Sequence, residues 1–383
     1  MRSAWCFGFL YLVSALPACS FGGDPGATRF RCESTAACPA PQICLQNYCQ
    51  DSPGPDGALL DDGAQVQADA DRANPLLLPW AESTPLPEVR DYNQAHAALV
   101  GDKIYVIGGY DWTITDEKNT VYYAQTSADG TVGEWQSAAT LPAKRANGDV
   151  VAYDGYLYLI GGASGGIAQS TVYVAPISDN GTVGSWTATT PLPAARKAHA
   201  SFAANGHVYA IGGADTSNGT SAVAYYARVA ADGALDAWQQ TTALPAARAN
   251  TASTYLDGFI YLIGGEGPLD TGHRTAYYAP VAADGSIGDW KETSELPAPR
   301  HFATAAALGG YIYLFGGIGT GGGQVADVFH APLQADGGLG DWAPNTSFPA
   351  LRARHATVLA SDFVYVIGGV VDVDTVYFAK RAP

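Results

Sequence analysis

The chain repeats one short apolar segment six times, and each copy ends in a pair of glycines. One copy, at 260–265, reads Ile-Tyr-Leu-Ile-Gly-Gly. The first glycines of successive copies lie 53, 51, 52, 52 and 52 residues apart. A fixed period near 50 residues indicates one supersecondary unit that is used repeatedly. The copies occupy 104–109, 157–162, 208–213, 260–265, 312–317 and 364–369.

The pattern within each unit predicts four short strands, which we name A to D in chain order. Strand B is the segment before the glycine pair, and it is apolar at nearly every position, which indicates that both of its faces are buried. In the unit around this copy, strand A is expected at 251–256 and strand C at 276–280, and strand D carries a tryptophan. Asp257-Gly258 between A and B and Asp284-Gly285 between C and D are typical of tight hairpin turns. The four strands therefore form an antiparallel meander.

A ring of such units would bury both faces of every B strand, as the blades of a propeller do, whereas an open sandwich would leave one face wet. The repeated region begins with a D-type strand near Trp80 and ends with a C-type strand at 375–380. The last unit therefore lacks its own strand D. The N-terminal strand can supply it and close the ring without a free edge. The sequence predicts an all-β, six-bladed propeller with four-stranded antiparallel blades over residues 80–383.

Each unit also carries a tryptophan, an arginine after a Leu-Pro or Phe-Pro pair, and an aromatic residue on strand C. We expect the tryptophans to pack between blades. Together with the doubled glycines, these marks resemble the kelch repeat over about 300 of the 383 residues. The C–D connection is longer than in typical kelch repeats, which favours a bacterial kelch-like variant. The arginines are Arg90, Arg145, Arg196, Arg248, Arg300 and Arg352.

The resemblance implies a binding platform, because kelch propellers mostly serve that role. A minority are enzymes, including galactose oxidase and a periplasmic sialic acid mutarotase. Copper-radical oxidation of the galactose oxidase kind requires a cysteine cross-linked to a tyrosine, and residues 80–383 contain no cysteine. The chain also lacks the G-x-S-x-G, H-E-x-x-H and P-loop motifs. We therefore expect no catalytic residues, no cofactor and no metal site.

The six cysteines all precede the repeats. Residues 1–18 are typical of an export signal, since an apolar run at 4–16 follows Arg2 and is too short to span a bilayer. The sequence Leu-Pro-Ala-Cys that ends at Cys19 resembles a bacterial lipobox, in which the cysteine is lipidated. The alternative is ordinary cleavage after Ala18. The lipobox predicts a protein that is held in the bacterial cell envelope, on the outer membrane facing the periplasm or on the cell surface, through a lipid anchor alone.

Residues 19–50 hold the lipidated cysteine and a small cysteine-rich segment. In an exported chain its four other cysteines indicate two disulfides with three possible pairings. A tetrahedral metal site is the alternative, but the close C-x2-C pairs that such sites favour are missing. Residues 51–79 follow as an acidic linker rich in turn residues, which we expect to be disordered. The disulfide candidates are Cys32, Cys38, Cys44 and Cys49.

The net charge of −16 argues against nucleic acid as a partner, because an acidic surface repels phosphate backbones. Hydrophobic residues make up 47% of the chain and charged residues only 15%, which excludes a wholly disordered chain. We expect a monomer whose partner is a protein or a glycan at the envelope surface.

Recognition is expected on the face of the propeller that carries the D–A and B–C loops, because variable loops on a rigid scaffold usually bind ligands. The six arginines open strand A at this face. They could bind an anionic ligand, since guanidinium suits carboxylates, or they could hydrogen-bond the backbone of a neighbouring blade. Residues that depart from the repeat are further candidates, namely His96, Trp112, Asn147, Lys197, His199, Asn250, His301, Arg354 and His355.

Three functions are compatible with this pattern. The first is an envelope-anchored, non-catalytic module that binds a protein or glycan through the loop face, where Trp112 could stack on a sugar or anchor its own loop. The alternative is a carbohydrate-active enzyme, an epimerase or mutarotase that acts on an acidic sugar at the mouth of the channel. The spread of the four histidines around the ring argues against a shared metal site. A purely structural role in the envelope is the third possibility.

Overall fold

The computed structural model describes residues 74–90, 96–268, 272–370 and 374–383, together with the backbone of 42–45 and 48–51. The chain divides into two compact units, Met1–Gln65 and Val66–Pro383. In the first unit, β1 (Gln42–Leu45) and β2 (Tyr48–Asp51) form an antiparallel hairpin whose register sets Cys44 opposite Cys49. The predicted export signal, Cys19, Cys32, Cys38 and the linker up to residue 73 lie outside the described residues. Where the structure describes the chain, it shows no helix with the length and hydropathy needed to span a bilayer.

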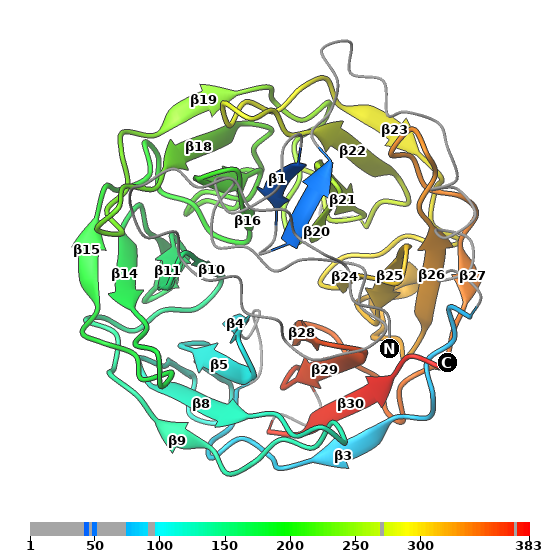
Figure 1. Cartoon of the computed structure of the whole chain (residues 1–383), viewed down its shortest axis with the longest axis horizontal. Helices are drawn as coiled ribbons and strands as arrows, with labels where there is room; N and C mark the ends of the chain where they lie inside the picture. The colour runs from blue at the N-terminus through cyan, green and yellow to red at the C-terminus, as the bar shows by residue number, and fades with distance from the viewer. Residues whose placement is uncertain (1–41, 46–47, 52–73, 91–95, 269–271, 371–373) are drawn as a thin grey trace, which may run out of the picture. The chain divides into compact units, whose positions relative to one another are not determined.

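The second unit contains six four-stranded antiparallel sheets, and in each the order from the axis outward is A, B, C, D (Figure 1). Neighbouring A strands contact one another around the axis, including β28 with β4, so the predicted six-bladed ring is confirmed. The blades are β4 (His96–Val100), β5 (Lys103–Ile107), β8 (Val121–Gln125) and β9 (Gln136–Ser137); β10 (Asp149–Tyr153), β11 (Tyr156–Ile160), β14 (Val172–Pro176) and β15 (Thr187–Thr189); β16 (Ala200–Ala204), β17 (His207–Ile211), β18 (Ala224–Arg228) and β19 (Gln239–Thr241); β20 (Ala252–Leu256), β21 (Phe259–Ile263), β22 (Ala276–Pro280) and β23 (Lys291–Thr293); β24 (Thr304–Leu308), β25 (Tyr311–Phe315), β26 (Val328–Pro332) and β27 (Ala343–Pro344); β28 (Ala356–Ala360), β29 (Phe363–Ile367), β30 (Val376–Lys380) and β3 (Ala81–Ser83).

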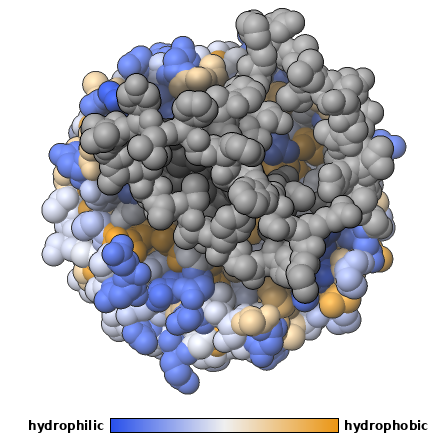
Figure 2. All heavy atoms as spheres, in the orientation of Figure 1, coloured by the Kyte–Doolittle hydropathy of each residue, from blue (hydrophilic) through white to orange (hydrophobic). Residues whose placement is uncertain are grey.

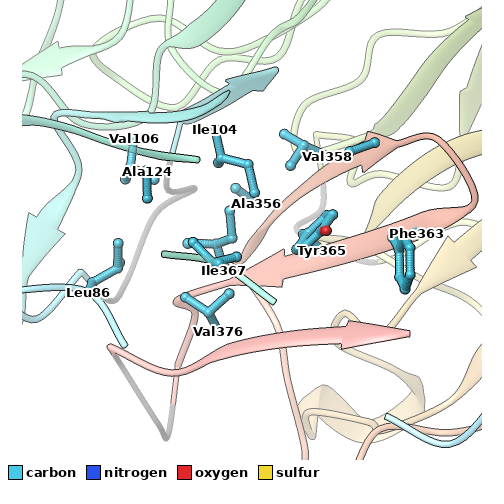
Figure 3. Packing of buried hydrophobic residues seen from close by; sticks show 12 residues of the cluster. Leu86, Ile104, Val106, Ala124, Ala356, Val358, Phe363, Tyr365, Ile367 and Val376 are labelled. Atoms are coloured by element: carbon cyan, nitrogen blue, oxygen red, sulfur yellow. The ribbon is translucent and has the colours of Figure 1, made fainter. Parts of the chain in front are cut away.

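The B strands are the most deeply buried elements, because each lies between the faces of two neighbouring blades. All residues of β29 are buried, and every B strand before it is buried from its second position onward. Figure 3 shows Ile104 and Val106 of β5 facing Val358 and Ile367 of the sixth blade across one such interface. The outer D strands are largely exposed, and Figure 2 shows hydrophilic residues along much of the outer margin with hydrophobic residues further inward.

The ring closes as the sequence predicts. Strand β3 pairs antiparallel with β30 and completes the sixth blade. The segment before β3 also joins the fifth blade, since the Leu77 N–H donates to Asn345 Oδ1 at 2.9 Å and Tyr313 Oη donates to Pro75 O at 2.7 Å. In the first blade the equivalent tyrosine, Tyr105, donates instead to a glycine carbonyl in the C–D turn of the second blade. The N-terminal segment therefore supplies both the missing strand and the missing turn contact.

The glycine pairs end the B strands where backbones of neighbouring blades crowd together. Both glycines of each pair have positive φ, for example 64° at Gly264 and 86° at Gly265. A Cβ on Gly264 would lie 2.3 Å from Arg300 O, which belongs to the next blade. A side chain at this position would therefore clash with the backbone of the next blade.

The repeated tryptophans link adjacent blades, as predicted. Each lies one residue before its D strand rather than on it, because only two or three residues pair there. The indole N–H donates to a backbone carbonyl of the preceding blade; Trp186 Nε1, for instance, lies 3.0 Å from Ala139 O. The same bond is made by Trp80, Trp135, Trp238, Trp290 and Trp342.

Candidate functional site

The first residues of the A strands surround the end of the central channel on the face that carries the D–A and B–C loops. There they enclose a cavity of about 180 Å³. Unlike the rest of the core, this cavity is lined largely by polar side chains, which makes it one of two candidate sites. Its polar lining includes His96, Asp149, His199, Ser201, Thr304 and His355.

The repeat explains why these residues meet. His96, Asp149 and Thr304 are each the first residue of an A strand, whereas His199 and His355 directly precede one. In the first unit 18 residues separate the arginine from the first glycine, compared with 16 in the other units. This two-residue insertion moves His96 into the position that Asp149 occupies in the second blade. His96 and Asp149 therefore lie at different distances from their arginines although they occupy the same place in the ring.

The three histidines of the cavity are buried and uncharged at neutral pH. His96 Nε2 accepts a hydrogen bond from the Gly148 N–H at 3.1 Å, so the proton of the neutral ring is on Nδ1. His355 Nε2 lies 2.8 Å from Thr304 Oγ1, and its Nδ1 has no hydrogen-bond partner among the described residues. His199 is 3% exposed, and neither of its ring nitrogens is hydrogen-bonded to any described residue. Burial, assisted by nearby arginines, lowers the pKa of each of the three to about 3.

Asp149 links the second and third blades across the cavity wall. Its Oδ2 accepts from the Ser201 N–H at 2.6 Å, and its Oδ1 accepts from the Val150 N–H at 2.9 Å. Burial nevertheless raises the pKa of Asp149 to about 7, so the carboxyl group is partly protonated at neutral pH. Over the described part of the chain, no group of three or more His, Cys, Asp or Glu side chains is arranged to hold a metal ion.

These pKa shifts predict opposite effects of pH on stability. The buried histidines bind fewer protons in the folded chain than in the unfolded chain between pH about 3 and 6.5, so they make stability rise with pH. Asp149 binds more protons when folded between pH about 4 and 7, so it makes stability fall as pH rises. In Asp149→Asn the free energy of unfolding should therefore climb more steeply between pH 4.5 and 6.5, by up to about 1.4 kcal/mol per pH unit.

Urea unfolding at a series of pH values measures this slope for the wild type and Asp149→Asn. Asp154→Asn, in an exposed turn of the same blade, is the control. An Asp149→Asn slope equal to the wild-type slope would contradict the assigned protonation of Asp149, whatever the absolute stability of the variant.

The six repeated arginines lie behind the cavity wall and are 0 to 5% exposed. Arg248 is typical: Nη1 donates to Gly264 O at 2.8 Å, and the guanidinium lies 5.2 Å from the centre of the Tyr277 ring. Arg90, Arg196 and Arg352 also donate to the first glycine of their own pair, so these bonds stay within one blade and do not cross to a neighbour. All six stack over the strand C aromatic of their own blade, on Tyr122, Tyr173, Tyr225, Tyr277, Phe329 and Tyr377. These contacts explain the repetition of the arginines by a structural role within each blade. Recognition of an anionic ligand by the arginines stays a prediction.

No protein-family model matches the chain. Among curated proteins, Kelch-like protein terF of Aspergillus terreus is 28% identical in an alignment of 283 residues that covers 67% of this chain and 57% of that protein. Kelch-like protein 35 of Mus musculus is 27% identical over 75% of this chain and 46% of its own length. These relatives share the repeat that builds the six blades. This chain is a kelch-repeat β-propeller.

Other similarities extend the comparison. Alpha-scruin of Limulus polyphemus is 25% identical over 64% of this kelch chain and 26% of its own length. The chain thus spans little more than half, or less, of these curated relatives. A solved structure titled "Structure of YjhT" superposes with a TM-score of 0.61 at 16% identity, covering 78% of this chain and 95% of that one, which shows a shared fold. Kelch propellers in general mediate protein interactions, and kelch-like relatives are mostly not enzymes.

A ring of backbone hydrogen bonds frames the cavity of the kelch propeller. The residues two positions after Arg145 and the later arginines have positive φ. From Ala198 onward each donates its N–H to the carbonyl of the equivalent residue one blade earlier, as from Ala198 to Asn147 at 2.7 Å. Asparagine tolerates this left-handed conformation better than most residues, which explains two of the predicted site residues. The ring contains Asn147, Ala198, Asn250, Phe302 and Arg354.

His301 and Lys197 are among the predicted site residues that do not line the cavity. His301 Nδ1 lies 2.8 Å from Glu266 Oε2 in the B–C loop of the preceding blade, and the other Glu266 oxygen accepts from Asn250 Nδ2 at 2.5 Å. Lys197 forms an isolated β-bridge with Ala214. The first contact ties a D–A loop to the B–C loop of the preceding blade, and the second ties a D–A loop to the B–C loop of its own unit, so these residues shape the loop face around the cavity.

The second candidate site consists of two B–C hairpins of the kelch propeller. In the first blade β6 (Tyr110–Asp111) pairs with β7 (Asp116–Glu117), and in the second β12 (Ala163–Ser164) pairs with β13 (Ile167–Ala168). We call their large exposed side chains, Trp112, Ile114 and Ile167, the hairpin patch; they are 52%, 59% and 56% exposed.

Polar contacts hold the two hairpins in place. The buried carboxylate of Glu117 accepts hydrogen bonds from the N–H groups of Gly165 and Gly166 at 2.7 and 3.1 Å, which joins one hairpin to the tip of the next. Asp111 pairs with Lys118 at 2.9 Å, and Asp116 pairs with Lys144. The hairpin patch is therefore carried by a braced support.

Sequence reasoning found Trp112 and the three histidines but missed Asp149, Ser201, Ile114 and Ile167. Aligning the units on their glycine pairs, instead of on their arginines, places Asp149 in the same ring position as His96. The two isoleucines could have been found as the single large aliphatic residue of each B–C loop sequence, 110–119 and 163–170.

Proposed function

We propose that this chain is a non-catalytic module that binds a protein partner through the face carrying the D–A and B–C loops. The observation that carries the proposal is the hairpin patch, in which three large apolar side chains are more than half exposed on adjacent, braced hairpins. Exposed apolar side chains on a rigid support are typical of protein interaction sites, where burial of an aromatic anchor supplies much of the affinity.

The composition of the hairpin patch favours a protein over a glycan. Two of its three members are isoleucines, which pack well against apolar protein side chains but offer a sugar no hydrogen bonds. The nearby carboxylates of Asp111 and Asp116, which a glycan would need as acceptors, are already paired with lysines. If Cys19 is lipidated as the sequence predicts, the module would present this face at a membrane surface.

An enzyme that acts on an acidic sugar is less well supported. A carboxylate substrate requires a fixed cation, and the polar side chains of the channel cavity are uncharged histidines, hydroxyl groups and the carboxyl of Asp149. The six arginines stand behind the cavity wall with their guanidinium groups on strand C rings.

Replacing the hairpin patch should abolish partner capture without affecting the fold. In Trp112→Ser/Ile114→Ser, proteins that the wild-type propeller captures from an envelope extract should be retained at least tenfold less, because truncating an anchor side chain costs about 2 kcal/mol or more of binding energy. Quantitative mass spectrometry of the captured proteins measures the loss.

The matched control is Leu351→Ser, which changes another side chain that is 53% exposed but lies outside the two hairpins. It should retain wild-type capture. If Trp112→Ser/Ile114→Ser captured the same proteins at the wild-type level, the hairpin patch would not be the binding site.

A further inference from the structure

The polar cavity is one end of a longer channel. A second cavity of about 380 Å³ lies further along the same A strands. The two cavities share Ala97, Val150, Ala305 and Thr357 in their walls, so they adjoin each other along the A strands. The length from the first to the fourth residue of an A strand is about 10 Å, because each strand residue advances the chain by about 3.3 Å.

The polarity of the channel changes along this length. At the loop face the wall carries histidines, Asp149 and hydroxyl groups. The second position of the A strands is an alanine or serine in four blades, as at Ala97 and Ala305, and a valine or threonine in the other two. Small side chains at this level leave the channel open, since leucine in their place would extend into it. At the fourth position the wall is mostly aliphatic and consists of Leu99, Ala152, Ala203, Tyr255, Ala307 and Leu359.

The polar end contains hydrogen-bonding atoms that the described residues do not satisfy. Both ring nitrogens of His199, Nδ1 of His355 and Oγ of Ser201 are buried without a partner there. A buried polar group that lacks a hydrogen bond destabilises the fold by about 1–3 kcal/mol. Three such side chains in one cavity wall indicate that something in the cavity hydrogen-bonds to them.

The charges in the cavity wall restrict what that molecule can be. Neutral imidazoles and hydroxyl groups can donate and accept hydrogen bonds, but they cannot balance a formal charge. Asp149 is an acid whose oxygens already accept two backbone N–H groups, so it does not attract an anion. The wall thus suits a head group that is uncharged and both donates and accepts hydrogen bonds.

We propose that the channel binds a small, uncharged, amphipathic molecule whose hydrogen-bonding head lies against His199 and His355 and whose short apolar chain runs past Ala305 toward Leu99 and Leu359. This site lies inside the ring, not on the loops, so it is separate from the hairpin patch and from the protein partner proposed for that patch.

Octanoylglycerol is a suitable probe, because it combines a neutral hydroxyl-bearing head with one short chain. Isothermal titration of the full chain, below the concentration at which the probe aggregates, should show saturable binding at one site. Glycerol, which is the head alone, and octanoate, which has a charged head, should each bind at least tenfold more weakly.

Two variants locate the site. His199→Phe keeps the ring and removes both nitrogens, and Ala305→Leu narrows the channel below the polar cavity. Each should weaken octanoylglycerol binding at least tenfold, whereas Ala282→Leu, at an exposed turn residue, should bind as the wild type does. His199→Phe should also melt no lower than the wild type in the absence of probe, since it removes buried unpaired nitrogens.

The proposal is overturned if octanoylglycerol does not bind the wild type, which would leave water as the occupant of the channel. It is equally overturned if octanoate or glycerol binds as tightly, or if Ala305→Leu binds the probe with wild-type affinity. None of these outcomes bears on the hairpin patch, whose test uses different residues and a different partner.

Discussion

Gly264→Ala is expected to lower the free energy of unfolding by about 3–5 kcal/mol, which is near the upper end for a single substitution. Alanine in the left-handed conformation that Gly264 adopts, with φ of 64°, is penalised by about 1–2 kcal/mol. The larger effect is steric, because the new Cβ would lie 2.3 Å from Arg300 O. Relief of that contact requires two neighbouring blades to separate. Urea unfolding followed by tryptophan fluorescence measures the change.

The same blade offers a matched control in Gly258, which lies in the A–B turn and has a φ of 83°. A Cβ there would meet nothing within 4 Å, so Gly258→Ala carries only the backbone penalty of about 1–2 kcal/mol. Equal losses in the two variants would show that backbone conformation alone accounts for the doubled glycine. The difference between them isolates the crowding of neighbouring blades.

Arg248→Leu is expected to destabilise the propeller by about 2–4 kcal/mol. The change leaves Gly264 O and Thr275 Oγ1 without a donor that now lies 2.8 and 2.6 Å away, respectively. It also removes the stacking on Tyr277, which contributes about 0.5–2 kcal/mol. Removal of a buried charge recovers part of this loss, so the net effect is smaller than the sum. Chemical denaturation gives the value.

Arg228→Leu is the control for this variant, since Arg228 is exposed at the end of β18 and its loss should change stability by less than about 0.5 kcal/mol. If Arg248→Leu were as stable as Arg228→Leu, the buried arginines would not support the blades, and a role in recognition would become the better explanation of their repetition.

The six-bladed architecture could be predicted from the sequence because the same pattern of apolar strands, glycine pairs and turn residues occurs in every unit. Strand B is apolar in all six units, and most of the turns carry Asx-Gly pairs. The first strand near Trp80 is of type D and the last strand, predicted at 375–380, is of type C, which implies closure of the ring. In the fourth blade strand C has the predicted bounds, whereas strand A there and strand C of the last blade were each predicted to begin one residue early. Errors of that size arise because the residue at which a strand begins or ends depends on its hydrogen bonds to the paired strand and not on its own side chain.

The candidate sites were less predictable, for a physical reason that His96 and His199 illustrate. Both are histidines near the start of strand A, yet one accepts a backbone hydrogen bond and the other has no partner among the described residues. That difference depends on atoms contributed by the neighbouring blade, about 50 residues away along the chain. The hairpin patch was only partly visible, because exposure of Ile114 and Ile167 is a property of the folded loop.

The origin of β3 has a consequence for biosynthesis. The sixth blade takes one strand from the start of the repeated region and three from its end, so its outermost hydrogen bonds join Ala81–Ser83 to Val376–Lys380. Five blades can assemble as the chain emerges, but the ring can close only after β30 has left the ribosome. Until then the edge of β3 and the apolar face of the first blade have no partner. If the chain is exported, as the sequence predicts, and is transported unfolded, β3 and β30 would pair only after transport.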